Sequence, residues 1–285
     1  MKDFNNKTAF ITGGSQGIGL GTAKLLAQKG ANVAIFARRK QVLDDALKQI
    51  QVGRIRPDQK FAVYSMDVSN EREVNDVLGK AVADLGVPDI LINCAGRARP
   101  DYFGNIPYAQ FDETIKIDLY GTWNTCAFLV PLMKKRGGYI VNTSSIVGFL
   151  GIFGYTDYAA AKFGVLGLSE ALRSELKQYN VGISVLCPPD TDTPGFVEEN
   201  KTKPPETRAV SGAANIMKPE AVASGLLKGV AKGDFIIIPS ADGKFTWIMK
   251  RWFPWLVDMV TDSQVRDTQK KMAGAKLQKG SKATS

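Results

Sequence analysis

The stretch Gly13-Gly14-Ser15-Gln16-Gly17-Ile18-Gly19 decides the fold of this chain. It follows an apolar run over residues 7–12 that predicts a buried strand, and it precedes a helical pattern over residues 20–29. Its glycines permit a tight turn, a close approach of the backbone to a pyrophosphate and tight helix packing. The first amide groups of the helix add free donors and positive potential. We therefore expect a phosphate-binding cradle for a dinucleotide, formed by Gly13, Ser15, Gln16, Gly17, Ile18 and Gly19.

Strand-like runs alternate with helical patterns along the chain. The strands are expected at 8–12, 33–37, 61–66, 90–93, 139–143, 183–186 and 235–238. This alternation predicts an α/β protein with a single Rossmann-type, doubly wound, mostly parallel seven-stranded sheet and helices on both faces. Ligands of such sheets bind beyond the carboxyl ends of the strands, where the glycine turn, Asn93, Ser145 and Pro188 are expected.

The residues after the second strand indicate which dinucleotide binds. An acidic residue at this point is typical of NAD sites, whereas this chain has Ala37 followed by Arg38 and Arg39. The Arg38 guanidinium can pair with the 2′-phosphate of NADP, and Ser15 can add a hydroxyl. We expect NADP(H) as the cofactor. The alternative is that Arg38, Arg39 and Lys40 only begin a solvated helix.

Ser145, Tyr158 and Lys162 are the candidate catalytic residues. A helix over residues 159–179 would hold Tyr158 and Lys162 one turn apart on one face, so that the ammonium lowers the tyrosine pKa. Lowering that pKa from about 10 by about three units requires about 4 kcal/mol. Ser145 supplies a hydroxyl that can orient a carbonyl. Together these three residues predict an enzyme that reduces a ketone. The alternative is that the Tyr–Lys spacing arises by chance on a solvated helix.

Composition excludes several other classes of chemistry. The chain has no histidine, which excludes Ser-His-Asp hydrolysis and histidine-ligated metals. Cys94, Cys126 and Cys187 are odd in number and widely separated, so we expect neither a disulfide framework nor a zinc site, and no other metal. The net charge of +9 is dispersed among acidic residues, which argues against nucleic-acid binding.

The C-terminal third carries two unusual segments. Residues 190–215 are rich in proline, glycine and threonine and are expected to form an irregular lid over the substrate, unless their prolines only end a helix. Residues 245–260 combine three tryptophans with Lys250 and Arg251, and are too polar to span a bilayer. They can lie at a membrane surface; the alternatives are packing on the body, walling the substrate pocket or filling a subunit interface.

These segments define the expected domain organisation. We expect one dinucleotide-binding domain over residues 1–240, including the lid, then an apolar and basic segment over 241–265 and a frayed tail over 266–285. The start Met1-Lys2-Asp3-Phe4 shows neither a signal peptide nor an apolar anchor. We expect a cytoplasmic protein that can also bind the membrane surface peripherally.

Over nearly its whole length the chain resembles the short-chain dehydrogenase/reductase family. Thr12 with the glycine turn resembles the family's cofactor loop, and Asn93-Cys94-Ala95-Gly96 resembles its Asn-Asn-Ala-Gly stretch. The resemblance implies an NADP(H)-dependent enzyme that forms homodimers or homotetramers. It also implies a cofactor site completed by Asp67, Val68, Asn93, Ala95, Gly96, Tyr158, Lys162, Pro188, Thr191 and Thr193.

Two details refine the resemblance. Asp118 stands where the family usually has an asparagine whose backbone carbonyl holds a water that links the lysine to solvent, so we include Asp118 among the catalytic candidates. Residues 188–204 resemble the subgroup that reduces long-chain lipid ketones. Reduction of a steroid, retinal or 3-oxoacyl lipid is the nearest alternative, and a non-catalytic NADPH-binding protein is a further one.

Overall fold

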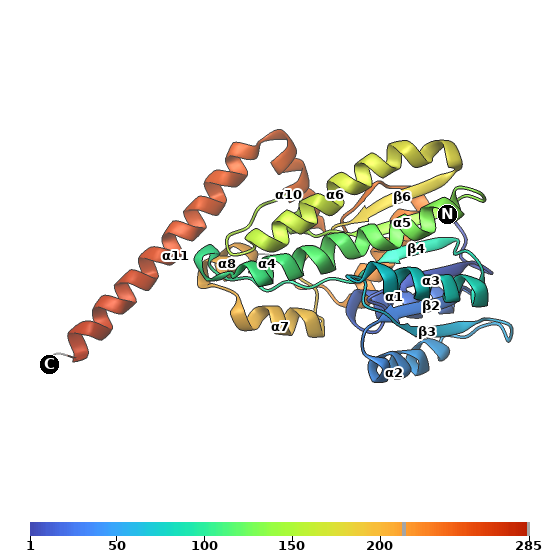
Figure 1. The fold of residues 1–285 in the computed structure, drawn as a ribbon. Coiled ribbons are helices and arrows are strands. Elements are labelled where there is room, and N and C mark those ends of the chain that lie inside the picture. The colour runs from blue at the N-terminus through green and yellow to red at the C-terminus, as the bar shows by residue number, and fades with distance from the viewer. Residues whose placement is uncertain (213–214, 284–285) are drawn as a thin grey trace.

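A computed structural model describes residues 1–212 and 215–283, and a seven-stranded sheet lies at the centre of this part (Figure 1). Its strands run in the order β3-β2-β1-β4-β5-β6-β7, and every neighbouring pair is parallel. All seven expected strands are present, so the doubly wound α/β prediction is confirmed. The strands are β1 (Thr8–Thr12), β2 (Asn32–Ala37), β3 (Phe61–Ser65), β4 (Ile90–Asn93), β5 (Gly138–Thr143), β6 (Val181–Leu186) and β7 (Ile236–Ile237).

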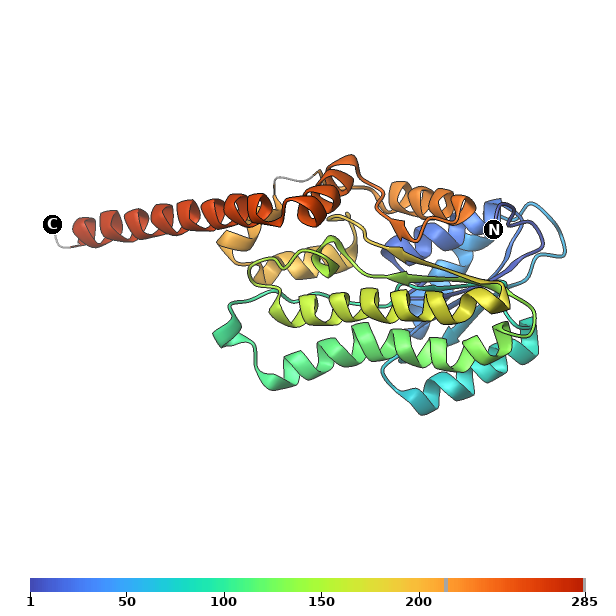
Figure 2. The same ribbon diagram turned by 90° about the horizontal axis from the view of Figure 1, so that it is seen from above.

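Helices cover both faces of the sheet (Figures 1 and 2). One face carries α1 (Gly17–Gln28), α2 (Lys40–Gln51) and α9 (Pro219–Lys232). The other carries α3 (Glu71–Leu85), α5 (Gly121–Met133) and α6 (Thr156–Leu176). The helix α4 (Tyr108–Ile115) continues through the π-helical segment η2 (Lys116–Tyr120) into α5. Short 3₁₀ turns complete the connections at η1 (Phe103–Asn105), η3 (Ile146–Gly148) and η4 (Lys177–Tyr179).

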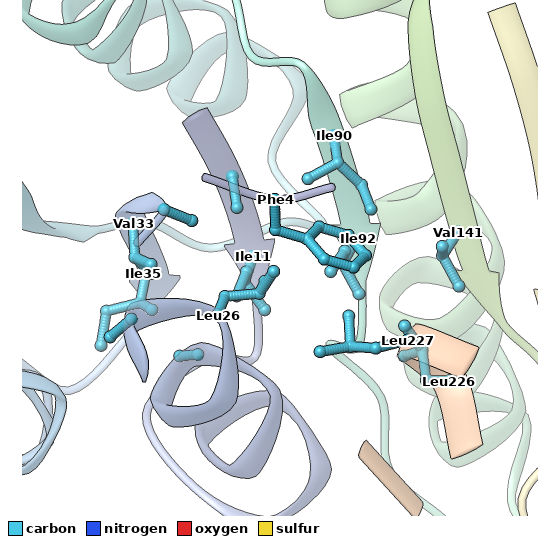
Figure 3. Close-up of a cluster of buried hydrophobic side chains, with 14 of the residues drawn as sticks. Phe4, Ile11, Leu26, Val33, Ile35, Ile90, Ile92, Val141, Leu226 and Leu227 are labelled. Carbon is cyan, nitrogen blue, oxygen red and sulfur yellow. The ribbon is translucent and has the colours of Figure 1, made fainter. Parts of the chain in front are cut away.

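The core follows the two-residue period of the strands. In β1, Ile11 packs with the α1, α2 and α9 side, while Phe10 packs with the α3, α5 and α6 side. Figure 3 shows the first of these clusters, in which Ile11, Ile35 and Ile92 from three neighbouring strands gather near Leu26 of α1. Apolar residues on both faces of each central strand are what a fully covered parallel sheet requires.

The strand order reverses between β2-β1 and β4-β5, which creates a switch point at the carboxyl ends of β1 and β4. The connections from these two strands leave in opposite directions, so a crevice opens between them. The glycine turn follows β1, and residues 94–98 follow β4. The fold therefore directs the predicted phosphate cradle and the predicted Asn93-Cys94-Ala95-Gly96 stretch to the same crevice.

The expected irregular lid is mostly helical. Residues Pro194–Thr202 form α7 and Pro205–Ser211 form α8, while positions 213–214 of the expected lid lie outside the described residues. Pro194 and Pro205 stand in the first turns of these helices, where a missing N–H leaves no helical hydrogen bond unmade. The prolines thus begin helices, which neither of the two interpretations of this segment foresaw.

Two helices follow β7: α10 (Ala241–Trp252) and α11 (Pro254–Ala283). The first part of α11 packs against α8 and α10, and the rest projects from the body (Figures 1 and 2). A frayed tail was expected over 266–285, whereas α11 is continuous to Ala283, and residues 284–285 lie outside the described part. Among the described residues, no helix combines the length and the apolar character needed to cross a membrane.

Candidate active site

The glycine turn between β1 and α1 is too crowded for side chains. Gly13 has a φ of +64°, and a Cβ there would lie 2.8 Å from the carbonyl oxygen of Cys94. A Cβ on Gly19 would overlap the carbonyl oxygen of Gly13, and Gly17 has a φ of +54°. Gln16, which precedes α1, makes no side-chain cap to the helix. Backbone amides are therefore left to line the cavity, and such a cradle fits the phosphates of a dinucleotide.

A cavity of about 350 Å³ runs from this cradle to the candidate catalytic residues. Most of the predicted site residues line this one cavity, because they follow the carboxyl ends of several strands or lie at the start of α1 and α6. The predicted residues that line it are Gly13, Ser15, Gln16, Gly17, Ile18, Gly19, Arg38, Arg39, Asp67, Val68, Ala95, Gly96, Ser145, Tyr158, Lys162, Pro188, Thr191 and Thr193.

Asn93 does not line this cavity, contrary to its predicted cofactor contact. Its side chain is buried and donates to Oδ1 of Asn142 at 2.9 Å, while its own Oδ1 accepts from the Thr125 hydroxyl at 2.8 Å. Both partners lie in the interior, on β5 and α5. Asn93 therefore ties the end of β4 to its neighbours and supports the residues after it from behind.

The basic end of the cavity lies beside the cradle. Arg39 donates to Oε1 of Gln16 at 2.6 Å, so this guanidinium is held against the glycine turn. Arg38 and the buried Ser15 line the same part of the cavity. Two guanidinium groups at this end, with no carboxylate at position 37 or 38, make an environment that favours an anion.

Ser145 and Tyr158 face the cavity from two different elements. Ser145 follows β5, and its Oγ accepts from the backbone N–H of Val147 at 3.1 Å, which fixes the start of η3. Tyr158 and Lys162 lie in the first half of α6, four residues apart as expected. The Nζ atom of Lys162 lies 5.4 Å from the centre of the Tyr158 ring and donates to the backbone carbonyl of Thr143 at 3.1 Å.

Asp118 lies behind the cavity and pairs with Lys162. Its Oδ1 is 2.8 Å from the lysine Nζ, and the two side chains are 0% and 3% exposed. The backbone N–H of Arg97 also donates to this carboxylate at 3.3 Å. The carboxylate itself therefore contacts Lys162, the candidate catalytic lysine, beyond the backbone role that the resemblance implied for this position.

The pKa of Tyr158 corrects one expectation. Burial raises the pKa of Tyr158 well above its ordinary value, and the negative charges of Asp118, Glu199 and Asp190 raise it further. The hydrogen bond with Ser145 has the opposite effect and lowers it. The Lys162 ammonium favours the phenolate but does not outweigh these effects, because Asp118 at 2.8 Å offsets part of its charge. The raised pKa leaves Tyr158 protonated at neutral pH but makes it a weaker acid, so transfer of its proton requires stabilisation of the phenolate.

Sequence reasoning missed a charged cluster formed by Tyr155, Asp190 and Glu199, which line the cavity, and by the buried Lys203. The Tyr155 hydroxyl donates to Glu199, and the Lys203 ammonium lies 2.9 Å from Oε1 of Glu199 and 3.5 Å from Oδ2 of Asp190. The i, i+4 spacing of Glu199 and Lys203 was the available signal for this pairing. Its position beside the active site depends on how α7 folds back over the sheet.

A second, mostly apolar cavity of about 400 Å³ adjoins the first. Ser145, Tyr155 and the segment 188–190 line both cavities. The far wall comes from α10 and the start of α11, through Phe245, Thr246, Met249, Leu256, Val257, Val260, Thr261 and Gln264. Residues 245–260 therefore wall a pocket, which was one of the alternatives for this segment.

The outer side of the same segment is exposed. Trp252 and Trp255 are 72% and 62% exposed, and Ile248, Phe253 and Met259 are also exposed. Trp247 differs, because it packs edge-on against Phe149 with ring centres 4.8 Å apart. One side of this segment thus faces the cavity and the protein, and the other presents large apolar groups to solvent.

Comparisons with known proteins agree with this geometry. A family model described as "short chain dehydrogenase" matches residues 7–204. The "3-ketodihydrosphingosine reductase" of Mus musculus is 40% identical over 235 residues, which cover 82% of this chain and 71% of that protein. The "3-oxoacyl-[acyl-carrier-protein] reductase FabG" of Chlamydia muridarum is 35% identical over 199 residues, covering 70% and 77%. The solved apo form of LigD from Sphingobium sp. strain SYK-6 superposes with a TM-score of 0.74 at 27% identity, covering 90% of this chain and 98% of LigD.

Proposed function

The chain belongs to the short-chain dehydrogenase family, and on this premise we propose that it reduces 3-ketodihydrosphingosine to dihydrosphingosine with NADPH. The observation that carries the proposal is the apolar cavity that opens beside Ser145 and continues from the cavity holding Tyr158. A long-chain ketone needs a polar reaction centre joined to an apolar space. The resemblance to the sphingoid-base reductase named above supports this choice among lipid ketones.

The residues of the first cavity suit NADP(H). The glycine cradle would hold the pyrophosphate, Arg38 and Ser15 the 2′-phosphate, and Asp67 with Val68 the adenine end. Pro188, Thr191 and Thr193 would border the nicotinamide, and Tyr158 with Lys162 its ribose. When bound, the cofactor supplies a hydride to the ketone carbon.

Tyr158 and Ser145 act on the ketone oxygen. The Tyr158 hydroxyl donates its proton to this oxygen, and the Ser145 hydroxyl donates a hydrogen bond to it as negative charge develops. The raised pKa of Tyr158 keeps the donor protonated before the reaction. Once the proton has left, the nearby ammonium of Lys162 stabilises the phenolate.

The second cavity would hold the alkyl chain. Each methylene transferred from water to such a space contributes about 0.8 kcal/mol, so a long chain binds tightly without any polar contact. Ser145, Pro188 and Pro189 line both cavities, and a chain extending from the ketone would pass between them.

Residues 245–260 would also contact a membrane surface, where such a lipid resides. Exposed tryptophans beside Lys250 and Arg251 form the combination that favours the headgroup region of anionic bilayers. The three free cysteines are compatible with a cytoplasmic location. Exposed aromatic side chains on α4, η2, α5 and α6 support self-association as a homodimer or homotetramer: Tyr108, Phe111, Tyr120, Trp123 and Phe163.

The test is NADPH consumption with 3-ketodihydrosphingosine in mixed micelles, with the product identified by mass. NADH and the Tyr158→Phe variant are run in parallel. We expect dihydrosphingosine to form in step with NADPH loss, and neither to occur in the variant. NADPH binding without turnover would overturn the proposal. A 3-oxoacyl thioester is assayed beside it, because the resemblance to the 3-oxoacyl reductase makes that substrate the second candidate.

A further inference from the structure

We propose that Asp190 and Glu199 bind the protonated amino group beside the substrate ketone, and that this contact selects α-amino ketones over other lipid ketones. The inference rests on the proposed function. It assigns a specificity-determining role to two residues that the reduction itself does not require.

The cluster around these carboxylates is fixed in place. Lys203 is only 2% exposed at its side chain, and its ammonium lies 4.8 Å from the centre of the Phe196 ring and 5.7 Å from that of Tyr155. It cannot move to solvent without uncovering these rings. Glu199 is held from the other side by the Tyr155 hydroxyl. The carboxylates therefore keep their positions before any substrate arrives.

The cluster also carries an excess of negative charge. Two carboxylates share the single ammonium of Lys203, and the Tyr155 hydroxyl is neutral. Two other cations that line the cavity have their own partners, since Lys162 is paired with Asp118 and Arg97 with Glu113. Asp190 is 3.5 Å from the Lys203 ammonium, a longer separation than the 2.9 Å to Glu199, and its side chain remains 26% exposed. One negative charge is thus left without a matching cation on the side that borders the cavity.

This charge lies beside the reaction centre. Asp190 lines both cavities, Glu199 lines the first, and the Tyr155 ring lies 5.8 Å from the Tyr158 ring between their centres. The charges of Glu199 and Asp190 also raise the pKa of Tyr158, which lines the same cavity. The amino group of 3-ketodihydrosphingosine is on the carbon adjacent to the ketone. A substrate held by Tyr158 through its ketone oxygen therefore brings a cation next to these carboxylates.

The same arrangement would reject ketones without a cation. A ketone with only apolar neighbours would cover a carboxylate without pairing it, and burying an uncompensated charge is costly. The cluster therefore discriminates by attraction of one substrate and by rejection of the others. A bound ammonium also offsets the charges that raise the pKa of Tyr158, so the substrate assists release of the tyrosine proton.

The experiment compares two ketones of equal chain length, 3-ketodihydrosphingosine and the 1-hydroxy-3-ketone in which hydrogen replaces the amino group. The measured quantity is the ratio of kcat/KM for the amino ketone to kcat/KM for the other. In the wild-type protein we expect a ratio above about ten, the scale of a hydrogen bond to a charged group. Glu199→Gln and Asp190→Asn should each lower this ratio about tenfold, mainly through KM of the amino ketone.

Glu198→Gln is the matched control, since this neighbouring carboxylate is 69% exposed and pairs with Lys201 at the surface. Its ratio should equal that of the wild type. NADPH binding measured by fluorescence verifies that each variant is folded. Should the variants fail to fold, the wild-type ratio decides, because a value near one overturns the inference.

The outcomes separate this inference from the proposed function. Turnover of both ketones at similar kcat/KM leaves the lipid-ketone reductase in place and overturns only the role of Asp190 and Glu199. If the kcat/KM ratio is unchanged in folded Glu199→Gln and Asp190→Asn, the role of these two residues is likewise overturned while the lipid-ketone reductase stands. Turnover of neither ketone by the wild-type protein overturns the proposed function and, with it, the inference.

Discussion

The Lys162 ammonium lies 2.8 Å from Oδ1 of Asp118, and both side chains are buried. The backbone around them is built for this pair. A Cβ on Gly96 would lie 2.5 Å from the same Asp118 oxygen and 3.1 Å from the lysine Nζ, so only glycine leaves room. Desolvation raises the pKa of Asp118, and the charge of Lys162 opposes that rise. The positive charge of Lys162 is therefore divided between Asp118 and the Tyr158 ring, whose centre lies 5.4 Å from the ammonium.

Asp118→Asn should lower the pKa of Tyr158. The Asp118 charge is, after burial, the largest cause of the raised pKa, so its removal favours the phenolate. Oxidation of dihydrosphingosine requires that phenolate, and its rate should begin to rise at lower pH than in the wild type. Ketone reduction at neutral pH should stay within about tenfold, because the lysine environment is one contributor among several.

The pH profile of kcat for the oxidation checks this. Glu113→Gln is the control, since Glu113 pairs with Arg97 beside the site but does not contact Lys162. Its profile should match the wild type. A profile of Asp118→Asn that is unmoved, or displaced to higher pH, would show that the carboxylate does not hold the tyrosine proton.

Tyr158→Phe should reduce turnover by at least about 10²-fold and leave NADPH affinity within a few-fold, because the variant lacks only the proton donor. Tyr155→Phe is the informative comparison, since its ring lies 5.8 Å away and lines the same cavity. It should lose much less activity than Tyr158→Phe. Steady-state reduction and fluorescence titration with NADPH measure the two effects, and equal losses in the two variants would refute the assignment of the proton donor.

Arg38→Ala should weaken NADPH binding about 10- to 100-fold and NADH binding little, because a charge-assisted hydrogen bond to the 2′-phosphate is lost. Lys40→Ala is the control, since Lys40 begins α2 and pairs with Asp44 at 2.5 Å. Its affinities should be unchanged for both cofactors. If Arg38→Ala weakens the binding of NADPH and of NADH equally, Arg38 does not bind the 2′-phosphate.

The parts of this structure that could be predicted from the sequence depend on local signals. The glycine turn, the strands and the Tyr158–Lys162 spacing are each contained within a few neighbouring residues, and the structure has all of them. The helix at the active site begins at Thr156, three residues before the expected start, because the Tyr158 stretch itself is helical.

The parts that could not be predicted depend on tertiary packing. Asp118 and Lys162 meet only because η2 and α6 lie side by side, and their separation in the chain carries no sign of it. The Asn93 side chain points inward because it forms hydrogen bonds with Asn142 on β5 and Thr125 on α5. The contact of Glu199 with Tyr155 likewise requires α7 to fold over the end of the sheet. A sequence pattern identifies residue types suited to a site but not which of them the fold brings together.

Replacing Trp252 and Trp255 together by serine should weaken binding to anionic vesicles by about tenfold or more. These side chains are 72% and 62% exposed, and moving a large apolar side chain out of water contributes about 1.5–3 kcal/mol. Sedimentation with phosphatidylserine-containing vesicles measures the binding, and added salt should weaken it further by screening Lys250 and Arg251. Ile55→Ser is the control, since Ile55 is 61% exposed but precedes β3, at the opposite edge of the sheet from β7, which leads into α10.

The same double variant separates the two sides of the segment. Reduction of a short-chain, micelle-free ketone should persist, because the cavity wall comes from other residues of α10 and α11, such as Met249 and Val257. Vesicle binding that equals the wild type, together with slower reduction of the soluble ketone, would instead mean that these tryptophans serve the pocket and that the protein meets its lipid without docking on a membrane through this segment.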